Sequence, residues 1–360
     1  MICNVYASVP FVNGGRSLIL NGYDHTPPWV KRAYVDALLG EAAGFAGEAV
    51  AWDVRSLTLG GGSASTLPEE ELGKMLRGLG RLLPIDRATP LYATFDPGLL
   101  TVGQANRLRE AGRPLPEFRY LAAESRIAAL FEMPVGEVEM AKTDLLLEQV
   151  GIDDIGMQVV VGAPGQTAEE VETSLRRALR STVQRFTLVT PTALGADARE
   201  TAVGHYRRAA AWLGERGFVE QAPLHFSRNG SVNPAVLDRY APLDGPGVAG
   251  LVCLGPCTAS CADGLAWSNT GDIDAYIAAE GDSEMVTAQV VEIDTPLRRL
   301  RADLNALWRG DAVQADASRR AALTEGGLFE SCGSDAVALS EWGRLCAAEA
   351  MARAAEALFR

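Results

Sequence analysis

Three cysteines in the second half of the chain, Cys253, Cys257 and Cys261, are close enough in sequence to act together. Thiolates at short spacings hold zinc ions and iron–sulfur clusters. However, Gly255-Pro256 interrupts regular structure between the first two. Free cysteine is also a common small buried residue. The triplet is therefore interpreted first as structural, with metal or cluster binding as the alternative.

Histidines are too sparse for a histidine-based zinc site. The sequence has three, His25, His205 and His225, and none of their pairs has ligand spacing. His25 follows Asp24 in a loop rich in Gly, Asn and Pro, and it is a candidate acid–base residue. We find neither a convincing Gly-x-Ser-x-Gly elbow nor a Walker phosphate loop.

Glycine-rich and acidic segments follow the predicted strands. Gly60-Gly61-Gly62-Ser63 ends one strand pattern, Asp96-Pro97 ends the next, and the segment 162–165 ends a later one. Glycine allows backbone N–H groups to approach a ligand closely. Because the carboxyl ends of parallel strands meet at one edge of a sheet, we expect functional residues in these loops.

Strand and helix patterns alternate along the first 220 residues, which predicts an α/β fold with parallel βα units. Strands are predicted at 2–9, 50–59, 90–97, 118–123, 157–164 and 185–191. Helices are predicted at 29–46, from 68 onward, and at 100–111, 136–150, 167–180 and 200–216. Six strands are fewer than the eight of a closed barrel.

The pattern weakens after residue 222, which suggests three regions. We predict a partial (β/α) barrel over 1–222 and an extension packing on the barrel over 223–294. A helical C-terminal domain follows over 295–360, with an end that resembles a winged helix.

Composition narrows the class of protein further. The net charge of −13 argues against a nucleic-acid binder, which needs a basic surface. The longest apolar runs are too short to span a bilayer, and the first residues do not resemble a secretory signal. Six cysteines in 360 residues do not indicate a disulfide scaffold. We expect a soluble cytoplasmic protein that acts on a small molecule, without a nucleic-acid or membrane partner.

The order of these signals resembles the radical S-adenosylmethionine (SAM) proteins of the oxygen-independent coproporphyrinogen oxidase and haem-chaperone branch. The similarity is collinear over residues 4–280. It rests on Tyr6-Ala7-Ser8-Val9-Pro10-Phe11, on a first helix with Tyr34, Ala37, Leu38 and Glu41, on Gly60-Gly61-Gly62-Ser63-Ala64-Ser65, on Gly162-Ala163-Pro164-Gly165-Gln166-Thr167, and on Leu254-Gly255-Pro256, Ser268-Asn269 and Asp274-Ala275-Tyr276. The resemblance implies an open (β/α)6 partial TIM barrel of radical-SAM type with a mainly helical C-terminal extension.

The chain departs from this branch at the residues that hold its cluster. The three cysteines of the family's Cys-x3-Cys-x2-Cys motif correspond to Val12, Arg16 and Ile19. None of these carries the thiolate that a [4Fe–4S] cluster requires, so no cluster is expected there.

Other family positions differ as well. Ser8 stands where histidine is usual, Thr94 replaces a glutamate, and Gln158 stands where aspartate is frequent. In the segment 119–125, Glu124 stands near the position of the family's glutamine.

The resemblance also implies which residues would hold SAM. They are Tyr6, Gly60, Gly61, Gly62, Ser63, Thr94, Ser125, Gln158, Gly162, Ala163 and Pro164. Arg16 could take over the carboxylate of SAM, because a guanidinium meets a carboxylate with two parallel hydrogen bonds. Glu124, Asp96 and His25 are the candidate bases.

The leading hypothesis is therefore a cluster-free enzyme that uses the sulfonium of SAM for polar group transfer. Methyl transfer or displacement and cyclisation would serve small-molecule or natural-product biosynthesis, with a partner enzyme from the same pathway. The alternative is a non-catalytic protein that binds haem or a partner on a degenerate radical-SAM scaffold. A third is a cluster on Cys253, Cys257 and Cys261. The second substrate, the transferred group and the oligomeric state stay open.

Overall fold

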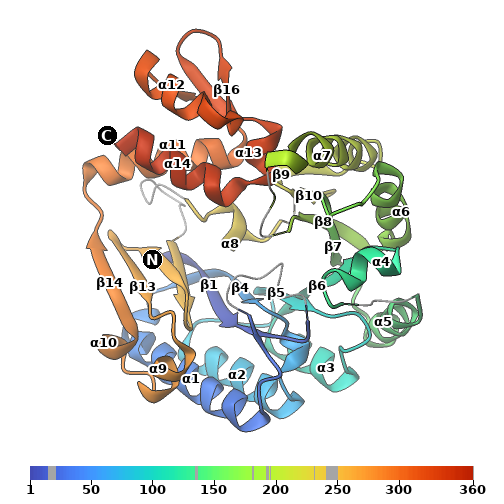
Figure 1. Ribbon diagram of the computed structural model, residues 1–360. Coiled ribbons are helices and arrows are strands. Elements are labelled where there is room, and N and C mark those ends of the chain that lie inside the picture. The colour runs from blue at the N-terminus through green and yellow to red at the C-terminus, as the bar shows by residue number, and fades with distance from the viewer. Residues whose placement is uncertain are drawn as a thin grey trace.

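Parallel strands form the centre of the molecule. Figure 1 shows the computed structural model, which describes residues 1–14, 22–133, 137–180, 182–191, 194, 196–230, 232–240 and 250–359. In these residues six parallel strands lie side by side, in chain order. They are β1 (Ile2–Val9), β4 (Asp53–Gly61), β5 (Pro90–Phe95), β6 (Arg113–Leu121), β7 (Ile155–Val160) and β8 (Val183–Val189). The predicted open (β/α)6 partial barrel is confirmed.

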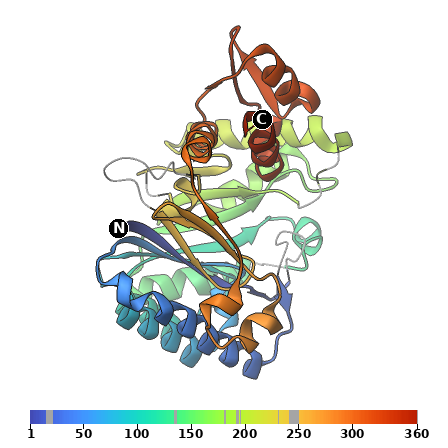
Figure 2. The same cartoon turned by 90° about the vertical axis from the view of Figure 1, so that its left-hand side faces the viewer.

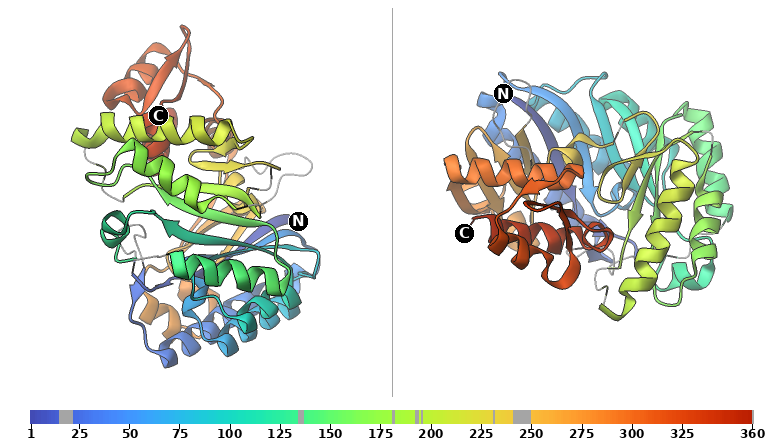
Figure 3. Two further views of the ribbon diagram at one scale, coloured as in Figure 1. Left: turned by 90° about the vertical axis from the view of Figure 1, so that its right-hand side faces the viewer. Right: turned by 90° about the horizontal axis from the view of Figure 1, so that it is seen from above.

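Helices cover the outer surface of the curved sheet (Figures 1 and 3). They are α1 (Pro28–Ala49), α2 (Glu69–Leu82), α3 (Val102–Ala111), the short α4 (Ser125–Ala129), α5 (Glu137–Val150), α6 (Ala168–Ala178) and α7 (Arg199–Gly214). Two of them begin with a capping box, in which the side chain of the cap and that of the third helical residue each accept a backbone N–H. The pairs are Thr101 with Gln104 in α3 and Thr167 with Glu170 in α6.

Strand β6 begins five residues earlier than the sequence pattern predicts. Pro114 and Pro116 argue against a strand there, because proline cannot donate to a ladder. However, β6 pairs with β7 only from Glu117 onward. The preceding part of β6 has β5 on one side only, which is where prolines are tolerated in a sheet.

Further strands extend the sheet at both ends. β11 (Gly250–Leu254) pairs in parallel with β1, and the antiparallel β12 (Ala259–Ala262), β13 (Leu265–Asn269) and β14 (Thr287–Glu292) follow it. At the other end β10 (His225–Ser227) pairs antiparallel with β8, and β9 (Val219–Ala222) lies outside it. Across the described residues the sheet has twelve strands. The sequence did not indicate the strands beyond 222, which are short and interrupted by glycine and proline.

The last part of the chain is mainly helical and lies at one end of the molecule, at the top of Figure 2. It contains α11 (Thr295–Arg309), α12 (Ala317–Thr324), α13 (Glu341–Leu345) and α14 (Ala347–Phe359). A small antiparallel sheet of β15 (Val313–Gln314), β17 (Ala336–Leu339) and β16 (Phe329–Cys332) accompanies these helices. In Figure 1, α11 and α14 cross the gap between β14 and β9.

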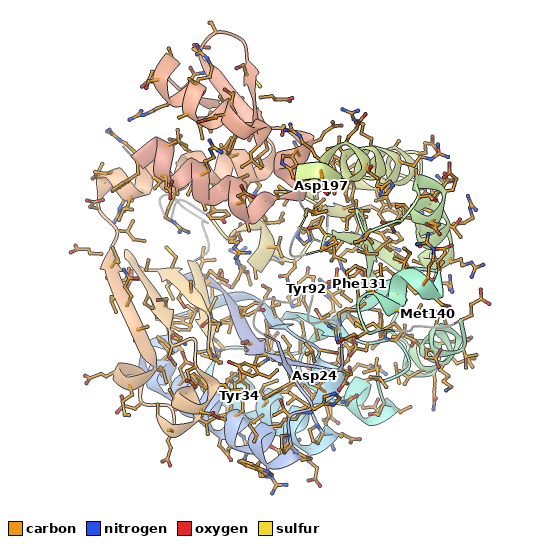
Figure 4. All side chains as sticks on the ribbon, in the orientation of Figure 1. Asp24, Tyr34, Tyr92, Phe131, Met140 and Asp197 are labelled. Atoms are coloured by element: carbon orange, nitrogen blue, oxygen red, sulfur yellow. The ribbon has the colours of Figure 1, made fainter. Side chains whose placement is uncertain are left out.

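Helix α8 (Pro234–Leu237) lies inside the curved sheet (Figure 1), and the residues in and around it hydrogen-bond both to the barrel strands and to helix α11. On the barrel side, Thr58 donates to the Asn233 side chain at 3.1 Å and Asn4 donates to Asp238 at 2.9 Å. On the other side, the Trp308 indole of α11 donates to the Val236 carbonyl at 2.8 Å. Figure 4 shows Tyr92 of β5 on the inner side of the curved sheet and Tyr34 of α1 on its outer, helix-covered side, where Tyr34 is buried.

The remaining elements are short. They are β2 (Phe11–Val12), β3 (Tyr23–Asp24), α9 (Ile273–Ala278), α10 (Ser283–Val286) and 3-10 turns at 64–66, 196–198 and 325–327. Among the described residues, we find no helix with the length and apolar character needed to cross a membrane.

Candidate functional site

The glycine triplet lies against the chain's own backbone at the carboxyl end of β4. A Cβ at Gly62 would lie 2.5 Å from the Val9 carbonyl oxygen and closer still to that of Phe11. A Cβ at Gly60 would lie 2.8 Å from the Tyr6 hydroxyl oxygen, and Gly61 has a φ of +92°. Next to the triplet, the Ser63 N–H donates to the Phe11 carbonyl at 2.9 Å. Close packing of the end of β4 on β1 and on the segment after it therefore accounts for the glycines without a ligand.

The loop 162–167 after β7 is bonded internally. Gly162 and Gly165 have φ values of +78° and +68°, which glycine adopts without strain. The Gln166 side chain accepts from the Ala163 N–H at 3.2 Å and donates to the Val160 carbonyl at 3.1 Å. Pro164 lies between these bonded residues. The turn that the resemblance predicts is present, and its geometry is fixed by Gln166.

Asp96 at the end of β5 forms a buried ion pair with Arg119 of β6. The Arg119 Nε donates to Asp96 Oδ1 at 2.7 Å, and the two side chains are 2% and 4% exposed. Ser65 donates to the other carboxylate oxygen at 3.3 Å, and Ser63 lies 2.6 Å from Ser65 through their hydroxyl oxygens. An Asp96 carboxylate held in this way is a structural anion and a poor candidate for the predicted base.

The other two candidate bases lie apart from this pair. Glu124 occupies the N-cap position of α4 without a side-chain bond to that helix, and its carboxylate accepts from the hydroxyl of Ser174 on the outer helix α6 at 3.4 Å. Ser125 begins α4 directly after it. The His25 side chain is 96% exposed, and its Nε2 lies 3.6 Å from a carboxylate oxygen of the adjacent Asp24. The structure thus records different partners for the three predicted bases and does not join them in one site.

A polar chain that the sequence reasoning missed crosses the middle of the barrel. Glu117 accepts from Thr187 at 2.6 Å and from Gln158 at 2.7 Å. Thr187 lies 3.2 Å from His225 Nδ1. Burial lowers the pKa of His225, which favours its neutral form. The sequence does contain a signal for this chain, which is the presence of polar residues within strands that are otherwise apolar. Alternate residues of a strand lie on the same face of the sheet, so such polar residues can meet inside the barrel.

This chain borders a small cavity of about 60 Å³ inside the barrel. Its lining includes Thr94 and Tyr92 of β5, Glu117, His225 and Asn233. Thr94 and Gln158, two of the predicted ligand residues, therefore lie at the middle of the barrel with Glu117. The space is sufficient for water-sized groups only.

A much larger cavity of about 610 Å³ lies between the extended sheet, α8 and α11. Its wall is mostly apolar and aromatic, with Tyr6, Tyr240, Trp267, Leu251 and Val291 among its members. Burial inside the curved sheet raises the pKa of the Tyr6 hydroxyl.

Two arginines give this cavity its positive charge. They are Arg239, which follows α8, and Arg301, which lies on α11. Burial lowers the pKa of Arg301, as expected for a cation withdrawn from water. Size, apolar lining and few convergent charges are the usual features of a ligand site.

The chain resembles known proteins in fold and, weakly, in sequence. No protein-family model matches it. The haem chaperone HemW of Bacillus subtilis is 23% identical over 137 residues, which is 38% of this chain and 36% of that protein. The match therefore spans about a third of the length of this curated relative.

The structural similarity is far more extensive. Coproporphyrinogen III oxidase HemN of Escherichia coli, a radical SAM enzyme, superimposes on 99% of this chain and 89% of its own, with a TM-score of 0.78 and 15% identity. The chain has the fold of this radical SAM enzyme. The resemblance recognised in the sequence is confirmed. The radical SAM methyltransferase TsrM of Kitasatospora setae matches 42% of the chain with a TM-score of 0.32, too low to carry an argument.

The segment that would carry the HemN-branch cluster does not fit one. Val12 lies in β2 with a side chain that is 2% exposed. Arg16 and Ile19 lie outside the described residues, and neither contains sulfur. Arg16 as an anchor for SAM stays a prediction.

Cys253, Cys257 and Cys261 all line the 610 Å³ cavity, which the sequence did not foresee. Burial raises the pKa of the Cys253 thiol to about 12, with Arg239 opposing the shift. Among the described residues, no group of three or more His, Cys, Asp or Glu side chains is arranged to hold a metal ion.

Proposed function

We propose that this chain is a tetrapyrrole-binding protein that uses the HemN-like barrel as a scaffold and carries no iron–sulfur cluster at residues 12–19. The observation that carries the proposal is the 610 Å³ cavity, with its aromatic and apolar wall and its two arginines. A tetrapyrrole is a broad, flat, apolar ring that bears carboxylates. Apolar walls bury the ring, and arginine pairs with carboxylates in a bidentate manner.

The names of the similar proteins support the same class of ligand. HemW is a haem chaperone, and HemN is a coproporphyrinogen III oxidase. Both names refer to tetrapyrroles, although HemW matches over a short stretch and HemN shows the fold alone. We expect the protein to work in the cytoplasm and to deliver or store its ligand without changing it.

The arginines provide the test. Arg301→Gln removes a charge from the cavity, and Arg299→Gln is the matched control, because Arg299 is an exposed residue of the same helix. Titration with haem and with metal-free protoporphyrin, followed by ligand absorbance, gives both affinities. Loss of one charged hydrogen bond, about 1.5–3 kcal/mol, predicts a roughly 10- to 100-fold weaker complex for Arg301→Gln alone.

The two ligands distinguish haem from porphyrin. Tighter binding of haem indicates that the iron contributes, and equal binding indicates that the ring and carboxylates suffice. Absence of saturable binding of either ligand to the parent chain would refute the proposal.

Cluster-free group transfer from SAM is the second candidate. It is favoured by the turns at 60–63 and 162–165, which lie at the carboxyl ends of β4 and β7 as in the predicted SAM site. It is weakened by the dispersed contacts of Glu124, Asp96 and His25. Calorimetry with SAM on anaerobically purified protein, with iron measured in the same sample, distinguishes the readings. Tight binding without iron supports transfer chemistry, and about four irons per chain support a cysteine-bound cluster.

A further inference from the structure

The two edge strands of the extended sheet, β9 and β14, differ in their contacts with the rest of the molecule. At one end β9 is short, and its Glu220 accepts from Tyr206 of α7 at 2.8 Å and pairs with Arg344 of α13 at 3.0 Å. At the other end β14 has its sheet neighbour β13 on one side only, within the described residues. Five of its six residues are exposed.

The open edge of β14 has only part of the usual protection, a shift of its register with β13 at Ala288. Native edge strands are blocked by lysine, proline, bulges or a covering element, because their free N–H and C=O groups pair with other strands. The sequence of β14, TAQVVE, has neither lysine nor proline. Val290 and Val291 are 59% and 38% exposed, and Met285, just before the strand, is 66% exposed.

The register of β14 shows which backbone groups face outward. Ile293 donates to the Gly264 carbonyl at 2.8 Å, which marks a hydrogen-bonded position of the β13–β14 hairpin. Such positions alternate with non-bonded ones in an antiparallel ladder. Val290 pairs with Trp267 and Glu292 with Leu265 at non-bonded positions. The N–H and C=O groups of Val290 and Glu292 are therefore directed away from β13.

We infer that two copies of this chain associate through antiparallel pairing of their β14 strands. With the outward positions bonded, Val290 lies opposite Val290 of the second copy, and Glu292 lies opposite Ala288, the residue at the register shift of β14. Gln289 lies opposite Val291. No pair of like charges meets across this two-fold ladder, and opposed β-branched residues stabilise a sheet.

The flanks of the strand have complementary charge. Asp282 and Glu284 precede β14. Arg298 and Arg299 follow it in the first turns of α11, after Asp294, whose side chain accepts from the Leu297 N–H as the cap of that helix. Antiparallel pairing places the acidic flank of one copy beside the basic flank of the other. Opposite charges on facing patches favour the association of this register over a parallel one.

The outer face beside β14 supplies the additional area that a stable dimer needs. A six-residue ladder alone falls well below the roughly 1,200 Å² of a stable interface. A groove of about 930 Å³ lies next to it, lined by Ala288 and Val290 of the strand and by Phe45, Trp52 and Trp267. The ring of Phe45 is 5.9 Å from that of Trp52 and 6.1 Å from that of Trp267. Pairing joins the grooves of the two copies, so apolar side chains of each copy can fill the other.

Light scattering coupled to size exclusion, on the full chain, tests this inference. The parent should have about twice its chain mass of 38.2 kDa. Val290→Pro removes one outward N–H and spares the β13 ladder, so it should give the monomer mass. Val290→Lys should do the same by charge repulsion at the two-fold axis. Val290→Thr keeps the N–H and the β-branched shape and should remain dimeric.

Circular dichroism of each variant controls for folding, and the lysine variant decides the result if the proline variant is unfolded. A parent chain that is monomeric throughout its soluble concentration range overturns the inference. A dimer that survives both Val290→Pro and Val290→Lys overturns it equally, because the contact then lies elsewhere.

Discussion

The hydroxyl of Tyr276 donates to Glu41 Oε2 at 2.5 Å, across 235 positions of sequence. Glu41 lies in α1 and is 1% exposed. It also accepts from Asn269 Nδ2 at 2.6 Å and from the Gly255 N–H at 2.9 Å. The carboxylate thus joins α1, the end of β11, the end of β13 and α9. This cluster attaches the extended strands, and with them the wall of the ligand cavity, to the barrel.

Tyr276→Phe should destabilise the protein by about 1.5–3 kcal/mol, the cost of losing a hydrogen bond to a charged group. Urea unfolding of parent and variant measures this difference. Tyr23→Phe is the matched control, because its hydroxyl contacts backbone groups of Gly271, at 3.4 Å, and Ile273 and meets no carboxylate. Equal effects of the two substitutions would contradict the role of the Glu41 cluster.

Glu41 should also make stability depend on pH. Burial raises its pKa above the ordinary 4.5, and the three donors only partly oppose the shift. The folded protein then binds this proton more tightly than the unfolded chain does. The contribution of Glu41 is fully present below about pH 4.5 and is lost as the pH rises through the raised pKa. As the pH rises from 4, the free energy of unfolding should fall more steeply for the parent than for Glu41→Gln. If the parent instead becomes more stable relative to Glu41→Gln, the pKa of Glu41 is not raised by folding.

The Asp96–Arg119 pair should be costly to break and inexpensive to replace. Removing one partner leaves a buried charge unpaired, so Asp96→Ala should cost about 3–5 kcal/mol. Replacing both, as in Asp96→Leu with Arg119→Met, should recover most of that loss. Urea unfolding of both single variants and the double variant provides the test. A loss below about 1 kcal/mol for Asp96→Ala would indicate that the carboxylate is available for other roles.

The glycine triplet should prove to be a packing feature in the absence of ligand. Gly62→Ala places a methyl group against the carbonyls of Val9 and Phe11, and overpacking of this kind costs about 1–3 kcal/mol. Gly44→Ala is the control, because a Cβ there meets nothing within 4 Å in helix α1. That substitution should stabilise the protein by up to about 1 kcal/mol. Thermal unfolding of the ligand-free variants distinguishes them, and an unaffected Gly62→Ala would restore the ligand-contact interpretation.

The sequence was sufficient for the barrel and insufficient for the ligand cavity. The strand predicted at 2–9 is observed as β1, and the one predicted at 157–164 is observed as β7 (Ile155–Val160). Both are largely apolar runs close to glycine or proline, so the local pattern identifies them. The landmarks Gly255, Asn269 and Tyr276 were recognised individually, but only the fold shows that they meet at Glu41. Long-range contacts of this kind leave no periodic signal.

The candidate site was harder still for two physical reasons. The candidate bases were selected by residue type. Residue type alone does not reveal that the Asp96 side chain forms a buried ion pair with Arg119. The cavity draws its wall from β1, the strands beyond 250, α8 and α11, whose proximity depends on the sheet continuing past β1. Arg239 and Arg301 therefore appear unrelated in sequence and adjacent in the fold, where Arg301 donates to the Arg239 carbonyl at 3.3 Å.

If a tetrapyrrole occupies the cavity between the extended sheet and α11, a bulky side chain that fills this cavity should abolish binding. Ala266 of β13 lines this cavity, while its neighbour Leu265 lines the groove on the opposite face. Equilibrium titration of metal-free protoporphyrin should show one saturable site per chain in the parent and in Leu265→Trp. It should show none in Ala266→Trp, with the variant still folded. Undiminished binding by Ala266→Trp would contradict the account.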